Sequence, residues 1–339
     1  MRNKPLSVTI KDVAQLAGVS SATVSRVLAH QPHVTEKVRQ HVLNAVNELH
    51  YQPNRVARSL RLQRANILGL VVADVQNPFF LAIVRAVEDI AIAHGYAVFL
   101  CNADEQVEKA KMYIDLMLAE NVAGVIIAPS RAENDPCLAC IEAGIPVVLI
   151  DRTLEDAQTD TVIVDNCQSA FRLVSHLIDD GYTRIGAIFG DLQVSTNRER
   201  RTGYEQALLT HNLPCAAELV RQGKPIQEVG YQLTCELLGL PEPPQALFCG
   251  NNLLTKGALQ ALHDRHLRIP DDIAVGAFDE SDWTSLMQPA LTVIAQPAYE
   301  IGTTATEFLL QRIRGDERPP REVVLNTAFH IRGSCAHHR

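Results

Sequence analysis

Near the beginning of the chain, hydroxyl side chains and one arginine form a group with the chemistry of a DNA-contacting surface. Arg26 carries the guanidinium fork that pairs with O6 and N7 of guanine in the major groove. Ser21 and Ala22 lie one turn before Arg26 on the same helix face; both are small, so Ala22 offers contact with a thymine methyl and little hydrogen-bond readout. Hydroxyls suited to phosphates, which position a protein without specifying sequence, are carried by Thr23, Ser25 and Thr35. The alternative is that these residues are ordinary caps and surface positions of a small helical bundle.

A second group of polar and aromatic side chains follows apolar runs farther along the chain and has the chemistry of sugar recognition. A sugar needs planar hydrogen-bonding partners for its hydroxyls and apolar faces for its C–H surface. Arginine and aspartate favour a polyhydroxylated ligand over a purine, because both bind neighbouring hydroxyls through paired hydrogen bonds. The candidate effector-binding residues are Asn77, Phe79, Phe80, Asp151, Arg152, Arg198, Asn251, Asp279 and Gln296. Each has an alternative interpretation: a helix cap for the Asn and Asp residues, core for the two Phe residues, a surface pair for Asp151 and Arg152.

Cys137 and Cys140 have the spacing of a redox or metal motif. No second pair lies at zinc-site spacing, and both fall in a predicted helix after Pro136, so buried packing is the favoured interpretation. The chain has no Gly-rich phosphate loop, no Gly-x-Ser-x-Gly elbow and no His-Glu-x-x-His motif. We therefore expect no metal, no cofactor and no catalytic residue. An enzyme on this fold would need a nucleophile–base pair, and none is visible.

The first group must be positioned by short helices. Apolar residues at helical spacing predict helices over residues 10–17 and 21–28, and a third that ends near Leu49. Gly18 is expected to end the first helix. The expected caps of the three helices are Thr9, Ser20 and Thr35. Two short helices around a tight turn, closed by a third, describe a helix-turn-helix module.

The second group must be positioned by a body in which apolar strands alternate with amphipathic helices. Predicted strands cover residues 67–73, 97–101, 124–128 and 147–151, then 185–190, 246–249, 273–278 and 291–295. This alternation is typical of doubly wound parallel sheets, and two such series indicate two similar subdomains. Ligands bind outside the carboxyl ends of such strands, so the cleft between the sheets is the expected site. The predicted fold class is α/β, with an N-terminal all-α module and two doubly wound parallel-sheet subdomains.

The charge of the chain is divided unevenly. The 339 residues carry a net charge of −8, yet residues 1–64 have ten Lys/Arg and three Asp/Glu, while the rest has 21 basic and 36 acidic residues. A basic head on an acidic body is typical of a small module that meets a polyanion. The apolar runs are far shorter than the roughly 20 residues that span a bilayer, and no apolar segment follows the first basic residues as in a signal peptide. We expect a cytoplasmic protein whose eight cysteines are reduced thiols.

The head resembles a family signature. Residues 9–28 read TIKDVAQLAGVSSATVSRVL and residues 51–60 read YQPNRVARSL. These runs resemble the helix-turn-helix and the hinge of the lactose/galactose repressor family of bacterial regulators, and the likeness continues through the body. It implies that residues 54–65 form a hinge helix that folds on DNA as a pair, with Leu60 inserted into the minor groove. The further DNA contacts that it implies are Thr9, Ser20, Asn54, Ala57, Arg58 and Arg61.

The resemblance also implies a body like the periplasmic sugar-binding proteins, whose polar clamp aligns with the candidate effector-binding residues. The expected domains are 1–53 for the DNA-binding head, 66–164 with 292–321 for one subdomain, and 165–291 with 322–335 for the other. Crossings between subdomains are thus expected near Asp165, Leu291 and Arg321. The chain departs from the family at Asn251–Asn252, where Asn-Asp is common, at Thr255–Lys256, and at residues 224–227, which lack an aromatic ring.

These features together predict a dimeric transcriptional repressor that binds a pseudo-palindromic operator in double-stranded DNA. A small carbohydrate in the cleft is expected to control its DNA affinity. The alternative is a regulator of the same class that answers a nucleoside or purine, or a phosphorylated carrier protein. A periplasmic transport receptor would share the body but would lack the basic head.

Overall fold

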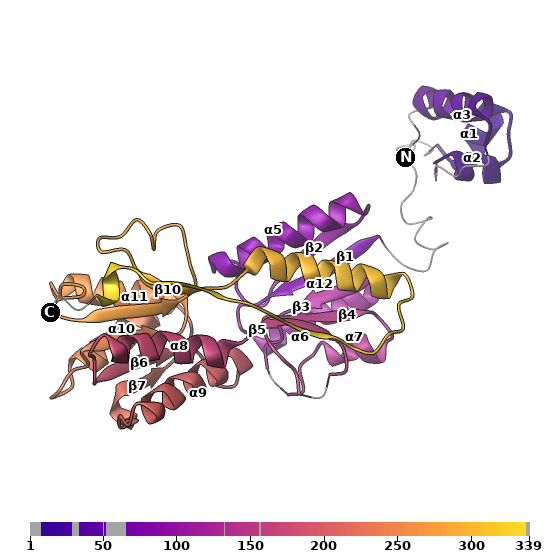
Figure 1. Ribbon diagram of the computed structural model, residues 1–339. Helices are drawn as coiled ribbons and strands as arrows, with labels where there is room; N and C mark the ends of the chain where they lie inside the picture. Colours follow the sequence, from indigo (N-terminus) through magenta and orange to yellow (C-terminus); the bar gives the residue numbers. More distant parts are fainter. Residues whose placement is uncertain are drawn as a thin grey trace, which may run out of the picture. The chain divides into compact units, whose positions relative to one another are not determined.

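The computed structural model describes residues 8–28, 34–49, 51, 66–131, 133–155 and 157–336. The chain divides into two compact units, one within residues 1–64 and one within residues 65–339 (Figure 1). The predicted hinge contacts lie outside the described residues: Asn54, Ala57, Arg58, Leu60 and Arg61.

The head is a three-helix module, as predicted. Its helices are α1 (Ile10–Ala17), α2 (Ser21–Leu28) and α3 (Glu36–Glu48). Gly18 ends α1 in the left-handed region, at φ 66°, where a residue without a Cβ is favoured. The six buried residues of its core come from all three helices: Val13, Ala14, Val24, Val27, Val42 and Ala45. A core this small leaves the outer face of α2 free for another role.

The body contains two six-stranded sheets, each covered by helices on both faces (Figure 1). The first has the order β11-β5-β4-β3-β1-β2, and all its described pairings are parallel. Its strands are β1 (Ile67–Val72), β2 (Ala97–Asn102), β3 (Gly124–Ile127), β4 (Val147–Ile150), β5 (Asp160–Val164) and β11 (Glu322–Leu325). Helices α5 (Pro78–Ala93) and α12 (Ala298–Ile313) cover one face, and α6 (Val107–Ala119) and α7 (Leu138–Glu142) the other.

The second sheet has the order β12-β10-β9-β8-β6-β7. Its strands are β6 (Ile185–Phe189), β7 (Val220–Gln222), β8 (Ala246–Cys249), β9 (Ala274–Phe278), β10 (Thr292–Ala295) and β12 (Ala328–His330). Strand β12 runs antiparallel to β10, so this sheet is not wholly parallel as predicted. Helices α8 (Asn166–Asp179) and α9 (Ser195–Thr210) cover one face, and α10 (Gln227–Leu238) and α11 (Asn252–Asp264) the other.

The chain passes between the two sheets three times, and two of the predicted crossings are wrong. Strand β10 pairs with β9, so residues 292–295 belong to the second sheet and the chain crosses after Ala295, not near Leu291. Strand β11 pairs with β5, so residues 322–325 belong to the first sheet and the last crossing follows Leu325, not Arg321. The remaining crossing joins β5 to α8. Short apolar runs carry no local signal of the sheet with which they pair, which explains both errors.

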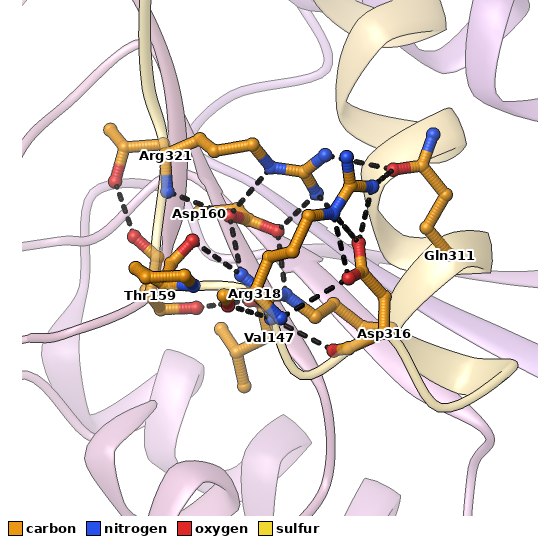
Figure 2. Close-up of polar contacts among 10 residues, drawn as sticks. Val147, Thr159, Asp160, Gln311, Asp316, Arg318 and Arg321 are labelled. Atoms are coloured by element: carbon orange, nitrogen blue, oxygen red, sulfur yellow. Dashed lines mark hydrogen bonds and ion pairs between the residues drawn. The ribbon is translucent and has the colours of Figure 1, made fainter.

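A network of charged side chains fastens the loop between α12 and β11 to the first sheet (Figure 2). The carboxylate of Asp160, buried at the start of β5, accepts two hydrogen bonds from Arg312 at 2.9 Å and two from Arg321 at 2.8 and 3.2 Å. Burial alone would raise the pKa of Asp160, but the hydrogen bonds from both arginines outweigh it and lower the pKa to about 2. The network thus joins the end of α12, the beginning of β11 and the edge of the sheet.

Candidate functional site

The predicted DNA contacts of the head lie on α2, in the turn before it and at the starts of α1 and α3. Ser20 caps α2, since its Oγ accepts a hydrogen bond from the backbone N of Thr23 at 3.1 Å. Ala22 and Arg26 are exposed on the helix, and Ser21 is half-buried. The hydroxyl and backbone N of Thr9 both donate to Asp12, at 2.8 and 2.7 Å, and lower the pKa of that carboxyl. Thr35 is exposed at the start of α3. Their contact with DNA stays a prediction.

The body brings eight of the nine predicted effector-binding residues around one cavity between its two sheets. They are Asn77, Phe79, Phe80, Asp151, Arg152, Asn251, Asp279 and Gln296. The cavity measures about 40 Å³, and a wider one of about 530 Å³ adjoins it and shares Glu105, Asn197 and Pro225. Ligand sites are usually several hundred Å³. The inner cavity alone is thus smaller than such a site, whereas the adjoining space is of that size.

Arg198, the ninth, lies outside this cavity. It is exposed and pairs with Glu155 at 3.2 Å. Arg200 lines the cavity instead: it is 4% exposed, lies 4.0 Å above the ring of Phe278, and donates to Asn166 and to the backbone oxygen of Gly250. Helix α9 begins at Ser195, three residues earlier than predicted, and each residue turns the helix by 100°. Thr196, Asn197 and Arg200 line the cavity, whereas Arg198, two residues from Arg200 and so on another side of the helix, is exposed.

Two neighbouring charged residues that follow β4 line the cavity. Asp151 has a left-handed backbone, φ 66°, and Arg152 lies 3.4 Å from its carboxylate. Burial raises the pKa of Asp151 to about 6, opposed by the charges of Arg152 and Arg200. Arg152 itself makes a two-pronged ion pair with Glu105, at 2.8 and 2.5 Å. The alternative interpretation of Asp151 and Arg152 as a surface pair is therefore wrong, because both side chains are buried.

Two asparagines join the subdomains across the cleft. The Oδ1 of Asn77 caps α5 by accepting from the backbone N of Phe79, and it also accepts from Nδ2 of Asn252 at 2.9 Å. Asn251 caps α11 through Leu254. The cap interpretation of Asn77 and Asn251 is therefore correct, and it does not compete with a place in the cavity.

Several buried polar atoms of the cavity wall have no hydrogen-bond partner among the described residues. They are Nε of Arg152, Oδ1 of Asn252 and Oε1 of Gln296, whose Nε2 donates to Asp279 at 2.7 Å. The rings of Phe79 and Phe80 meet edge to face, 5.0 Å apart, beside them. Donors, acceptors and ring faces around one space suit the hydroxyls and C–H surface of a sugar.

Sequence reasoning missed Glu105, Arg200 and Asn252 as cavity residues or partners of cavity residues. Arg200 could have been found from the sequence, because it lies four residues after Thr196 and three after Asn197, and residues at these spacings share one helix face. Asn252 was noticed only as a departure from the family. Glu105 follows no strand directly, and its contact with Arg152 spans 47 positions of sequence, so no local pattern could reveal it.

Other candidate chemistry finds little support in the structure. Cys137 and Cys140 are fully buried, and burial raises the pKa of both thiols, that of Cys140 to about 11. Within the described ranges, no group of three His, Cys, Asp or Glu side chains is placed to hold a metal ion. No helix in the described part of the chain is both long and apolar enough to cross a membrane.

Two family models match the chain. "Bacterial regulatory proteins, lacI family" matches residues 9–54, and "Periplasmic binding proteins and sugar binding domain of LacI family" matches residues 65–332. The HTH-type transcriptional repressor PurR of Mannheimia succiniciproducens is 32% identical over 327 residues, covering 96% of this chain and 98% of that protein.

Two solved structures are also similar over nearly the whole chain. The lac repressor dimer bound to operator and the anti-inducer ONPF has a TM-score of 0.86 at 28% identity, covering 98% of this chain and 100% of that one. The complex of the transcriptional regulator CelR with cellobiose has a TM-score of 0.73 at 29% identity, covering 96% and 99%.

Proposed function

Since the chain belongs to the lacI family of bacterial regulatory proteins, we propose that it is a transcriptional repressor whose affinity for operator DNA is controlled by a carbohydrate bound between its two sheets. The chain is a DNA-binding transcriptional regulator, with the helix-turn-helix head of that family. It works as a homodimer on a pseudo-palindromic operator in the cytoplasm, as the dimeric lac repressor on its operator supports. It is not an enzyme.

The observation that carries the effector class is the polar and aromatic lining of the cleft. Asp151, Asp279 and Gln296 offer paired acceptors and donors, and Phe79 offers a ring face, all at the ends of strands or the beginnings of helices. Such groups match neighbouring hydroxyls and a sugar's C–H surface. The cellobiose complex of a relative supports the same class of ligand.

We expect ligand control to arise from the linkage between the two sheets. Because the three crossing segments link two separate sheets, opening and closing is a hinge motion, and a ligand that binds one form better shifts the balance between them. If that balance also sets the position of the heads, DNA and effector affinities must be coupled reciprocally.

Thermal melting against pentoses, hexoses, sugar phosphates and nucleosides tests the effector class. A ligand at 100 times its Kd adds about 2.7 kcal/mol to the free energy of unfolding, which raises the melting temperature by several degrees. A shift with a free sugar, followed by a changed affinity for operator DNA, is the expected result. A shift with nucleosides alone would show that the effector is a nucleoside and not a sugar, and the proposal of a repressor would still stand. No shift, together with altered DNA binding on addition of a phosphorylated carrier protein, would make a protein the regulator.

A further inference from the structure

We propose that Glu105 selects the charge of the effector, so that the cleft admits an uncharged polyhydroxylated ligand and rejects phosphorylated and acidic sugars. The inference rests on the proposed function and narrows it. It concerns a residue that no sequence pattern marked and that follows β2 at the mouth of the cleft.

Glu105 occupies the face of the Arg152 guanidinium formed by Nη1 and Nη2. A guanidinium has five N–H groups. In Arg152, Nη1 donates to Glu105 at 2.8 Å and to the backbone oxygen of Pro129 at 2.9 Å, and Nη2 donates to Glu105 at 2.5 Å. The Nε has no hydrogen-bond partner among the described residues and lies 3.4 Å from a carboxylate oxygen of Asp151. Two N–H groups remain, on Nε and on Nη2, and both lie beside the carboxylates of Asp151 and Glu105, so an anionic ligand that used them would meet those negative charges.

The electrostatic balance of the cleft points the same way. Around the inner cavity, the carboxylates of Glu105, Asp151 and Asp279 outnumber the cations of Arg152 and Arg200. At the mouth, Asp104, Glu105 and Asp191 face a single lysine, Lys224. An anionic ligand would have to leave water for a space whose described side chains carry a net negative charge, and buried charge without a matching partner is costly. Glu105 contributes to both spaces.

The backbone holds Glu105 in this position at a cost. Asp104 and Glu105 both have left-handed backbones, with φ of 52° and 56°, a conformation that costs about 1–2 kcal/mol per residue outside glycine. Three contacts oppose that cost: the N of Glu105 donates to the oxygen of Ala73 at 3.1 Å, Asp104 pairs with Lys109, and Asn102 donates to Asp104 at 2.6 Å. A strained turn held from several sides is typical of a functional position.

The test compares matched pairs of ligands that differ in charge: D-ribose with D-ribose 5-phosphate, D-glucose with D-gluconate, and adenosine with its 5′-phosphate. Calorimetric titration of the full-length protein gives Kd for each. In the wild type we expect the neutral member of the binding pair to be favoured by at least about 30-fold. Equal affinity for both members would overturn the selection by charge and leave the cleft as an effector site. Binding of neither member of any pair would overturn the effector class itself, and this proposal with it.

The variant Glu105→Gln then assigns the selection to this residue. The amide keeps one acceptor for Arg152 but removes the charge, so we expect affinity for the anionic member to rise by about tenfold or more while the neutral member changes by less than about threefold. Glu108→Gln removes the same charge from an exposed position of the same segment and should leave the ratio of the two affinities unchanged. An unaltered ratio in Glu105→Gln, with the melting temperature retained, would make the ion pair purely structural and overturn the assignment.

Discussion

Arg200 links the cavity to the polypeptide segment on which the two sheets turn. Its guanidinium lies against the ring of Phe278, and its Nε donates at 2.9 Å to Asn166, the first residue after the crossing from β5. The same Asn166 donates to Glu199 at 3.0 Å. An effector that contacts Arg200 therefore touches a side chain that is bonded directly to a crossing segment.

We expect Arg200→Lys to weaken effector binding by at least tenfold, because an ammonium reproduces neither the stacking on Phe278 nor the two directed hydrogen bonds. Arg198→Lys, two residues away on the exposed face of α9, is the matched control and should bind as the wild type does. Isothermal titration with the effector found by melting measures both. The reverse ranking would restore the sequence-based choice of Arg198.

Asp151 gives effector binding a pH dependence. Burial raises the pKa of its carboxyl to about 6, so about a tenth of it is ionised at pH 5 and nearly all at pH 7.5. If sugar hydroxyls donate to this carboxylate, affinity should fall about tenfold from pH 7.5 to pH 5. Asp151→Asn should abolish that difference, and a difference that persists in the variant would assign the titration elsewhere.

The same shift has a defined effect on stability. The pKa in the folded protein is above that of an unfolded Asp, about 3.9, so protonated Asp151 favours the fold. This contribution is fully present below pH about 4 and is lost as the pH rises through about 6.

At the scale of elements, the connection between α12 and β11 depends on Asp160. Two arginines from the end of α12 and the beginning of β11 converge on this one carboxylate, whose side chain is fully buried. We expect Asp160→Asn to lower the free energy of unfolding by about 3 kcal/mol, because two partly buried cations lose their anion. Glu317→Gln, exposed in the nearby loop, is the control for net charge and should change the melting temperature little.

The pH dependence of this network is opposite in sign to that of Asp151. The pKa of Asp160, about 2, is below its unfolded value, so its contribution is present above pH about 4 and is lost as the pH falls towards 2. Calorimetric melting of wild type and Asp160→Asn between pH 2 and 6 checks this: the two curves should converge at the acid end. A constant separation would contradict it.

The helices α5 and α11 meet across the cleft at their first turns, where Asn252 donates to Asn77. Asn252→Asp removes the donor and buries a carboxylate against an amide oxygen. We therefore expect the free energy of unfolding to fall by about 1–3 kcal/mol and the cleft to open further. Asn251→Asp is the matched control for stability, because a carboxylate still caps α11 by accepting from Leu254. Melting temperature and the radius of gyration in solution measure the two effects. Equal melting temperatures for both variants would contradict the role of this bond.

Most elements could be predicted because their signals are local. Apolar periodicity, the caps Ser20 and Asn77 and the stop at Gly18 depend on a few neighbouring residues, and the structure has those helices and strands. What depends on distant contacts could not be predicted. Three features arise only when distant parts of the chain come together. They are the pairing of β10 and β11 with their sheets, the contact of Glu105 with Arg152, and the hydrogen bond from Asn252 to Asn77. Arg198 was chosen over Arg200 because the predicted helix after β6 begins at Arg198, whereas α9 begins at Ser195 and Arg200 lines the cavity.

At the scale of the whole molecule, charge separates the two tasks of the chain. The head is basic and the rest carries 21 basic against 36 acidic residues, so a polyanion is attracted to the one and repelled by the other. We expect operator affinity to fall by about 10³-fold or more between 50 and 200 mM salt, as for six or more phosphate contacts. Fluorescence anisotropy with labelled operator measures the slope, and affinity independent of salt would contradict it. Arg26→Ala should reduce sequence discrimination more than it reduces that slope.

The crossings also have a consequence for the synthesis of the protein. The first sheet includes β11, and its core includes Ile301 and Leu309 of α12, which the ribosome produces about 230 residues after the end of β1. The growing chain must therefore keep the apolar faces of β1 to β5 covered by other means until residue 325 has emerged. By then the elements of the second sheet up to β10 have already been made. The subdomain that begins first is thus completed late, and a chain that stops before residue 298 lacks part of the core of the first subdomain as well as the end of the second.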